Sequence, residues 1–312
     1  MIVSLVLVHG LHGGHIKTWT SITTDGKRVV WPRDLLPKKQ PRTRVLSFGY
    51  MGDIYNNNII AGIGDNARSL LAHIKIRRRA DPDRPIVFIA HCVGGLIVKQ
   101  ALCIASNEEE YISIARATHT VMFFGTPHFK KGQRGNILAI ANAYDTLAEQ
   151  STTRRRIGSK RSKLADQMMN NELDFVEMSE DFVQVVPALA KIRSFCESLP
   201  LRGTEKVIVQ PMDTRLYNDQ EEPHMIQADH IGMCQFEKVN DPTLLLVRNY
   251  IHDAVKKEER GQEEKQDEEV SEEEETQLGQ KIEGVSVIVE EAIPRVRRHR
   301  GLAGFFSRRK VR

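Results

Sequence analysis

The chain has 312 residues, of which 40% are hydrophobic and 28% charged, and its formal net charge at pH 7 is +4. This is a globular composition, long enough for one large α/β domain with an appendage, and no window reaches the roughly 18 uncharged apolar residues that a transmembrane helix needs. The four cysteines form no CxxC pair, which fits free thiols in a reducing compartment better than a disulfide framework or a zinc site. A cytoplasmic protein is therefore expected.

Short apolar, β-branched runs recur along the first part of the chain and predict strands. They are residues 2–9, 44–50, 85–91, 119–125, 191–196 and 206–210. Because the runs are almost continuously apolar and are separated by helix-length connections, they predict a mainly parallel sheet of about six strands, with helices on both faces. The first run lacks the basic segment and cleavage site of a signal peptide, so it is expected to be a buried strand.

The connections between these runs predict helices. The segment NARSLLAHIKIRRR, after Asp65, has the pattern of a capped amphipathic helix, and residues 94–105 predict a buried one. The longest connection, 126–190, is predicted to be a helical insertion that acts as a lid over the sheet edge. It carries a basic cluster within residues 154–163.

The composition changes near Lys256, where the chain continues as KKEERGQEEKQDEEVSEEEETQ. Such a charge run cannot bury a core, so we predict one domain over 1–256 and a linker with a basic tail over 257–312, disordered or partly helical. The basic insertion and the tail predict peripheral contact with an anionic membrane surface. Plain solvation, or a nuclear-localisation signal in the tail, is the alternative; no nucleic-acid partner is expected.

The segment VFIAHCVGGLIVKQAL indicates a strand, a sharp turn and a helix, with Cys92 at the tip of the turn. Ala90 and Gly94 are the small residues that the G-x-S-x-G nucleophile elbow requires two positions on either side of its nucleophile. A thiol before a helix N-terminus is favoured as thiolate by the helix dipole. The elbow therefore predicts that Cys92 is a nucleophile, whereas an isolated cysteine among apolar residues is usually a buried structural thiol.

The turn VHGLHGGH follows the first predicted strand and suits an oxyanion hole. Its glycines let the backbone N–H of Leu11 point to the same place as the N–H of Val93, the residue after the elbow cysteine. A phosphate loop is a poorer interpretation because it needs a glycine immediately before the Lys-Ser/Thr pair, and here Ile16 precedes Lys17-Thr18. A metal site on the histidines of this turn is also disfavoured, since a tight glycine turn does not aim them together. No metal or organic cofactor is expected.

The remaining catalytic groups are predicted from the strand order. His230, in QADHIGMCQF, follows the last predicted strand and is the candidate base. Glu197 ends the penultimate strand and is the candidate acid, with Asp213 as the alternative because it also lies between nucleophile and base. Asp229 is less suitable, since a neighbour of His230 cannot easily reach its ring.

These residues together resemble the α/β-hydrolase family of serine esterases and lipases found in fungal proteins, related to the SERAC-type lipid-remodelling hydrolases. The matching segments are VHGLHGG, KTW, WPRDLLP, RVLSFGY, DNARSLL, FIAHCVGGLIVKQAL, MFFGTPH, RSFCESLP and ADHIGMCQF. Where the family has G-H-S-x-G-G, this chain has Ala90 and Cys92, and Met212-Asp213-Thr214 replaces the family's E-S-A segment. The resemblance implies an α/β-hydrolase fold without the first two strands of the eight-stranded form.

The residues and the resemblance together predict an ester or thioester hydrolase, or an acyltransferase, acting on a small-molecule or lipid acyl substrate. Cys92 would attack the carbonyl, His230 would move the proton and Glu197 would orient the imidazolium. The alternative is a catalytically silent hydrolase fold that binds a ligand or a signalling partner. The resemblance also implies the mitochondrial or endoplasmic-reticulum membrane surface as an alternative location.

Overall fold

A computed structural model of the chain describes residues 2–50, 59–132, 170–185 and 190–256, together with residues 137, 140, 141, 143 and 168. The chain divides into a compact unit, Met1–Glu259, and a second unit, Arg260–Arg312. All described residues belong to the first unit. The tail predicted at 257–312 and the basic cluster at 154–163 lie outside the described residues, and the domain limits remain a prediction.

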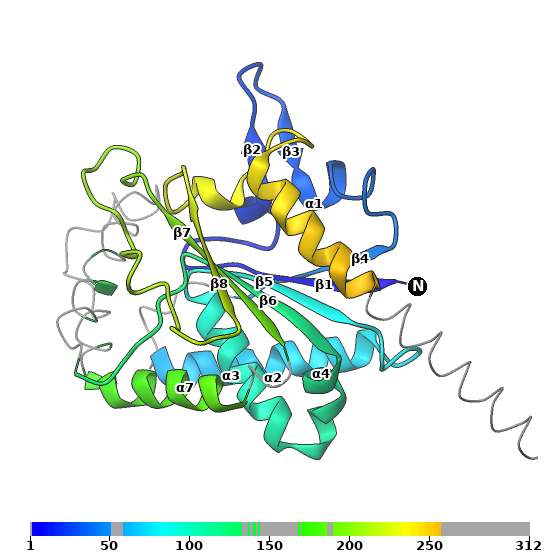
Figure 1. Ribbon diagram of the computed structural model, residues 1–312, viewed down its shortest axis with the longest axis vertical. Helices are drawn as coiled ribbons and strands as arrows, with labels where there is room; N and C mark the ends of the chain where they lie inside the picture. The colour runs from blue at the N-terminus through cyan, green and yellow to red at the C-terminus, as the bar shows by residue number, and fades with distance from the viewer. Residues whose placement is uncertain are drawn as a thin grey trace, which may run out of the picture. The chain divides into compact units, whose positions relative to one another are not determined.

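The core of the first unit is a six-stranded sheet in the order β4-β1-β5-β6-β7-β8 (Figure 1). Every neighbouring pair of its strands is parallel. The strands are β1 (Val3–Val8), β4 (Thr43–Phe48), β5 (Ile86–His91), β6 (Thr118–Phe124), β7 (Lys191–Glu197) and β8 (Glu221–Ile226). The first five coincide with predicted apolar runs and confirm them to within two residues at each end.

The sixth strand was predicted at residues 206–210, and this prediction is wrong. That segment is a loop, although Ile208 and Val209 are buried. The apolar character of this run correctly indicated burial, but the inference from burial to strand pairing failed. The actual edge strand, β8, has the sequence EEPHMI and is largely exposed. Because an exposed edge strand needs no apolar run, the sequence pattern did not predict it.

Helices cover both faces of the sheet because both faces are apolar. In β5, Phe88 and Ala90 pack toward one core and Val87 and Ile89 toward the other. Figure 1 shows a layer of long helices on one face, and α1 (Trp31–Asp34) with the helical residues 242–256 on the other. The long helices are α2 (Ile59–Arg77), α3 (Gly94–Asn107) and α7 (Glu172–Val185), and the short α4 (Ile112–Ala117) packs against α3.

Two local features differ from the sequence expectation. Helix α2 begins at Ile59, so Asp65 lies inside the helix and is not its cap; Gly62 and Gly64 weaken the helical signal of the first turns. An antiparallel hairpin of β2 (Thr20–Ile22) and β3 (Arg28–Val30) was not predicted. Its signal was the Asp-Gly pair in TTDGKR, where Gly26 has φ of +79°.

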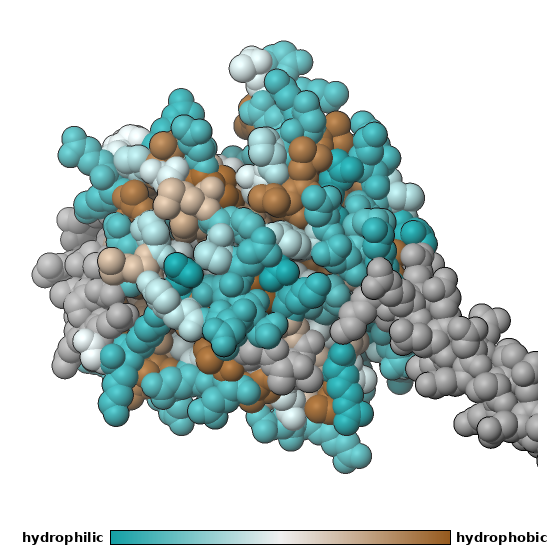
Figure 2. All heavy atoms as spheres, in the orientation of Figure 1, coloured by the Kyte–Doolittle hydropathy of each residue, from teal (hydrophilic) through white to brown (hydrophobic). Residues whose placement is uncertain are grey.

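Single turns of 3₁₀ helix occur as η1 (Lys17–Trp19), η3 (Glu109–Tyr111) and η4 (Gly232–Cys234). Hydrophilic side chains predominate on the face drawn in Figure 2, and the hydrophobic ones form separate patches. In the described part of the chain, no helix combines the length and apolarity needed to cross a bilayer.

The strand order fixes where a ligand site can form. From β1 the chain crosses to β4 at one edge and then returns to β5 on the other side of β1, so the order reverses between β1 and β5. Ligands of open parallel sheets bind at the carboxyl ends of the strands beside such a reversal. The segment after β1 is the glycine turn, and the segment after β5 is the elbow that leads into α3. The chain thus has the α/β-hydrolase fold.

Candidate active site

The turn between β5 and α3 holds Cys92 in an unfavourable backbone conformation. Its φ is 55°, the left-handed region that non-glycine residues rarely adopt. Two contacts at the end of β6 hold the turn: the Cys92 N–H donates to the carbonyl of Phe124, the last residue of β6, at 2.9 Å, and the hydroxyl of Thr126, two residues further on, donates to the Cys92 carbonyl at 3.1 Å. The side chain of Cys92 is therefore presented by a rigid, strained elbow at the carboxyl end of the sheet.

Glycines allow the turn after β1 to pack directly against this elbow. A Cβ on Gly94 would lie 2.3 Å from the His9 carbonyl oxygen, and one on Gly10 would lie 2.4 Å from the Cβ of Cys92. Neither approach leaves room for a side chain. The proposed oxyanion turn and the elbow therefore form one close-packed unit.

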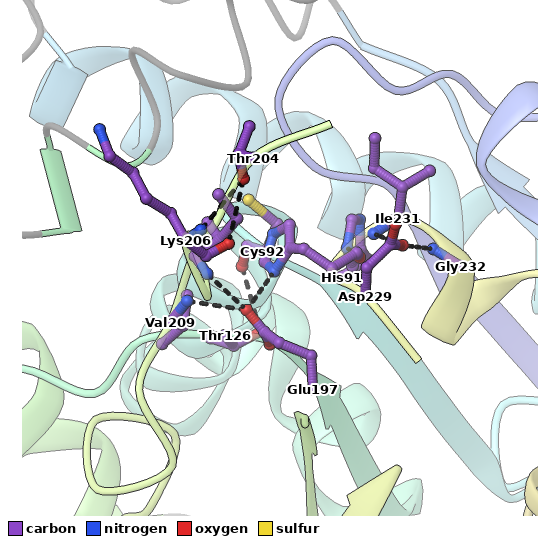
Figure 3. Close-up of polar contacts among 12 residues, drawn as sticks. His91, Cys92, Thr126, Glu197, Thr204, Lys206, Val209, Asp229, Ile231 and Gly232 are labelled. Carbon is purple, nitrogen blue, oxygen red and sulfur yellow. Dashed lines mark hydrogen bonds and ion pairs between the residues drawn. The ribbon is translucent and has the colours of Figure 1, made fainter. Parts of the chain in front are cut away.

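His230 and Glu197 approach this unit from β8 and β7, at the same carboxyl end of the sheet. Glu197 is the last residue of β7, and His230 follows β8 by four residues. The His230 Nδ1 lies 3.1 Å from the Glu197 Oε1, and both side chains are buried. The same oxygen accepts the backbone N–H groups of Ile208 at 3.1 Å and Val209 at 2.8 Å; Figure 3 shows the carboxylate with Val209.

The charges of these groups depend on one another. Burial lowers the pKa of His230, but the Glu197 charge and then the charge and hydrogen bond of Cys92 outweigh burial and raise the pKa above its usual value. Burial raises the pKa of Glu197, and the charge and hydrogen bond of His230 reverse this, so that the pKa is lowered. The site therefore favours an imidazolium between a carboxylate and the sulfur of Cys92.

His91 contacts the backbone of His230, a role that was not predicted from the sequence. Its Nε2 lies 2.8 Å from the His230 carbonyl oxygen, and the two rings lie 4.8 Å apart. Burial, and then the charge of His230, lower the pKa of His91 to about 3. The neutral ring donates its Nε2–H to that carbonyl, which fixes the backbone of the candidate base.

Gly125 makes room for the His230 ring. It follows β6 with φ of +54°, and a Cβ there would lie 2.8 Å from the His230 Nδ1. Any side chain at this position would therefore displace the imidazole from Glu197.

The amides of Leu11 and Val93 belong to the two segments that pack at the elbow. Within the described part of the chain, no hydrogen bond uses either N–H as its donor. Leu11 precedes His12, whose φ of 52° turns the chain sharply. Two amides not engaged by the protein itself are what an oxyanion hole needs.

Tyr50 fixes the start of the glycine turn and was also not singled out from the sequence. Its ring stacks on His9 with centroids 4.3 Å apart, and its hydroxyl donates to the His9 carbonyl at 2.7 Å. Burial, followed by the charge of Cys92, raises the pKa of Tyr50. Its place after β4, at the end of a strand beside β1, was the available signal.

The two other carboxylates considered from the sequence have different surroundings. Asp213 lies in a turn. Its backbone N–H donates to the Gln210 carbonyl, and its backbone carbonyl accepts the His128 N–H at 2.7 Å. Asp229 accepts the Gly232 N–H at 2.7 Å and the Ile231 N–H at 3.2 Å, as in a turn, and Figure 3 shows both contacts. The carboxylate on the His230 ring nitrogen is that of Glu197.

No protein-family model matches the chain. Among curated proteins, it is 24% identical to Protein SERAC1 of Danio rerio over 273 residues, which cover 80% of this chain and 39% of the relative. It is 25% identical to Protein SERAC1 of Homo sapiens over 281 residues, 81% of this chain and 39% of the relative. The chain thus spans about two fifths of the length of the curated relatives it matches.

Solved structures resemble the chain more remotely. The lipase BlEst2 of Bacillus licheniformis is 15% identical with a TM-score of 0.47, over 80% of this chain and 92% of the lipase. The RedJ thioesterase of Streptomyces coelicolor is 10% identical with a TM-score of 0.44, over 80% of this chain and 90% of the thioesterase.

Proposed function

We propose that the chain transfers or hydrolyses acyl groups, with Cys92 as nucleophile, His230 as base and Glu197 as the group that orients His230. The observation that carries this proposal is the buried contact of His230 with both the Cys92 thiol and the Glu197 carboxylate. A strained elbow, a base and an orienting acid together are the recognised arrangement for nucleophilic catalysis.

In the first step the Cys92 sulfur attacks the acyl carbonyl carbon, and the thiol proton is held by the His230 Nε2. The carbonyl oxygen becomes an oxyanion, which the Leu11 and Val93 amides stabilise. When the intermediate collapses, the bond to the leaving group breaks, and His230 returns the proton to the departing alcohol or thiol. The acyl group is then a thioester on Cys92.

In the second step water attacks that thioester while His230 takes its proton, and the thiol of Cys92 leaves with the carboxylic acid as product. An alcohol or thiol in place of water would give acyl transfer. Glu197 retains its charge throughout, because three hydrogen-bond donors converge on its Oε1. This charge stabilises the imidazolium that forms in both steps.

A thiolate leaving group matches the Cys92 chemistry best. Attack by a thiolate on a thioester exchanges one thiol for another of similar basicity, whereas attack on an alkyl ester must expel a far more basic alkoxide. We therefore expect thioesters and activated esters to react faster than simple alkyl esters.

The second candidate is a hydrolase fold that binds a ligand without turnover. The observation that favours it is the identity of Cys92 and Ala90, where the family resembled by the sequence has serine and glycine. Restoring that serine distinguishes the two candidates, because a disabled serine hydrolase would gain esterase activity in Cys92→Ser, whereas a cysteine enzyme would lose activity.

The first experiment compares a thiol-directed probe and a fluorophosphonate on the purified protein, with each labelled peptide identified by mass spectrometry. Iodoacetamide is expected to label Cys92 before the other cysteines. Burial raises the pKa of Cys103 to about 12 and raises the pKa values of Cys196 and Cys234, and thiols are inert when protonated. Modification of another cysteine while Cys92 stays intact would overturn the proposal.

We also propose the predicted peripheral membrane contact for the basic tail. Binding to vesicles that contain acidic phospholipid should weaken steeply with salt and on deletion of residues 294–312. Binding that ignores both changes would remove the membrane contact without affecting the catalytic proposal.

A further inference from the structure

A cavity lies between the segment after β6 and helix α7, apart from the elbow. We call it the α7 cavity. It measures about 340 Å³, and its walls include the apolar side chains of Phe129, Val183 and Leu216. His128 and Ser179 also line it, and both are almost wholly buried. Such a mainly apolar cavity with a few convergent polar groups is typical of a small-molecule site.

A buried lysine on helix α3 lies behind the wall of this cavity and contacts Ser179. Lys99 is 0% exposed, and its Nζ lies 3.3 Å from the Ser179 Oγ and 3.4 Å from the Pro127 carbonyl oxygen. Burial lowers the pKa of Lys99 to about 7, although Cys103 and Glu221 act in the opposite direction. No carboxylate forms an ion pair with this amine among the described residues, so the neutral form is accessible near neutral pH.

The hydrogen bonds around Ser179 place its oxygen next to the Lys99 amine. The Ser179 oxygen accepts the backbone N–H of Phe129 at 3.3 Å and a hydrogen bond from the Lys99 Nζ at 3.3 Å, and the same amine donates to the Pro127 carbonyl. When the amine has lost a proton, its lone pair can accept the serine proton across this contact.

His128 supplies a third polar group. Within the described part of the chain, neither of its ring nitrogens has a hydrogen-bond partner. Burial, followed by the charges of Lys99 and Lys130, lowers the pKa of His128 well below its usual value. The ring is therefore neutral and has one N–H available for an oxygen of a bound molecule, which would relieve the cost of an unpaired buried donor.

From this geometry we propose that Ser179 and Lys99 form a nucleophile and general-base pair in the α7 cavity, a second site for small, apolar, activated acyl compounds. The Ser179 oxygen forms a bond to the acyl carbon while its proton moves to the Lys99 nitrogen. The bond to the leaving group then breaks, and the departing alcohol takes that proton. Water then attacks the acyl carbon, and its proton moves to the Lys99 nitrogen. The bond from that carbon to the Ser179 oxygen breaks, the oxygen takes the proton back, and the acid leaves. Serine paired with lysine is a known catalytic arrangement.

The site shares no group with the Cys92 mechanism, so the two proposals can fail separately. The test uses the Cys92→Ala protein and a small alkyl fluorophosphonate. Serine attack on the phosphorus expels fluoride and leaves a stable phosphonyl adduct, which peptide mass mapping can locate. We expect the adduct on Ser179, and Ser179→Ala should abolish it. Lys99→Met keeps a long apolar side chain and should slow labelling roughly a hundredfold, as expected for loss of a general base.

Ser106→Ala is the matched control, because Ser106 lies on the same helix as Lys99 but donates to the Leu102 carbonyl. Adding Ser106→Ala to the Cys92→Ala protein should leave the rate of Ser179 labelling unchanged. The rate should rise with pH through about 7, the pKa of Lys99, and then level off. Thermal melts would verify that every variant is folded. An unlabelled Ser179 at pH 9, or labelling that persists unchanged in Lys99→Met, would overturn the proposal, whatever Cys92 does.

Discussion

The elbow site and the α7 cavity lie near the two ends of one stretch of chain, residues 92–99, and each holds a buried basic group, yet the two groups favour opposite charge states. At the elbow, the buried His230 is held beside the Glu197 carboxylate, and its pKa rises. At the α7 cavity, Lys99 is buried with a hydroxyl and a carbonyl as partners, and its pKa falls. Burial alone neutralises a basic group, and an adjacent opposite charge reverses that effect.

The largest effect is expected from removing the members of the elbow pair. Cys92→Ala and His230→Ala should each lower kcat for an acyl thioester by at least about a thousandfold, and the double variant should be no worse than either. The single and double variants can be compared by steady-state kinetics. Additive losses would show that nucleophile and base do not act as a unit.

A smaller effect is expected when the charge of Glu197 is removed and its shape is kept. Glu197→Gln should lower the pKa of His230, because burial would no longer be opposed by the carboxylate, and should lower kcat/KM roughly 10²- to 10⁴-fold. The pH dependence of the His230 ring signals in NMR measures the first change. An unaltered His230 titration would contradict the paired-charge account.

Removal of the Tyr50 hydroxyl is expected to lower activity less than the changes above. Tyr50→Phe keeps the ring that stacks on His9 and removes the hydrogen bond to the His9 carbonyl. Loss of about 1 kcal/mol from the oxyanion turn should lower kcat about fivefold with little change in KM. A rise in KM alone would indicate a role in substrate binding.

Lys99→Met tests the charge state of the α7 cavity through the free energy of unfolding. Lys99 has a lowered folded pKa of about 7, so between that pH and its unfolded value the unfolded chain binds the extra proton. Stability should therefore rise with pH across that window, by about 1.4 kcal/mol per pH unit from this group. Lys99→Met should remove that slope in urea unfolding measured from pH 7 to 10. Equal slopes in the two proteins would mean that Lys99 stays charged when folded.

Much of the fold was predictable because buried parallel strands carry near-continuous apolar runs, as in β1 and β5. The positions of Cys92 and Glu197 followed from where predicted strands end, since the carboxyl ends of parallel strands share one edge. His230 was placed after a strand at 206–210 that is a loop, and in the structure it follows β8 instead. The failures have a common cause: β8 is an exposed edge strand, and its sequence pattern is polar. The run 206–210 is buried for another reason, as its amides hold Glu197.

Other features depend on contacts between distant segments, which no local pattern encodes. Lys99 and Ser179 are 80 residues apart, and each alone looks like an ordinary residue of an amphipathic helix. Tyr50 and His9 are 41 residues apart and meet because β4 pairs with β1. Such pairs can be recognised only once strand order and helix packing are known.

The central claim is that Cys92 carries the acyl group, and trapping that intermediate tests it most directly. The protein would be mixed with a short-chain acyl thioester, quenched in acid within the first turnover and mapped by peptide mass spectrometry, with Cys92→Ser as the comparison. The account predicts one acyl group on the peptide that contains Cys92 and slower turnover by Cys92→Ser. An unmodified Cys92 in an inert wild-type protein, together with esterase activity gained by Cys92→Ser, would contradict it.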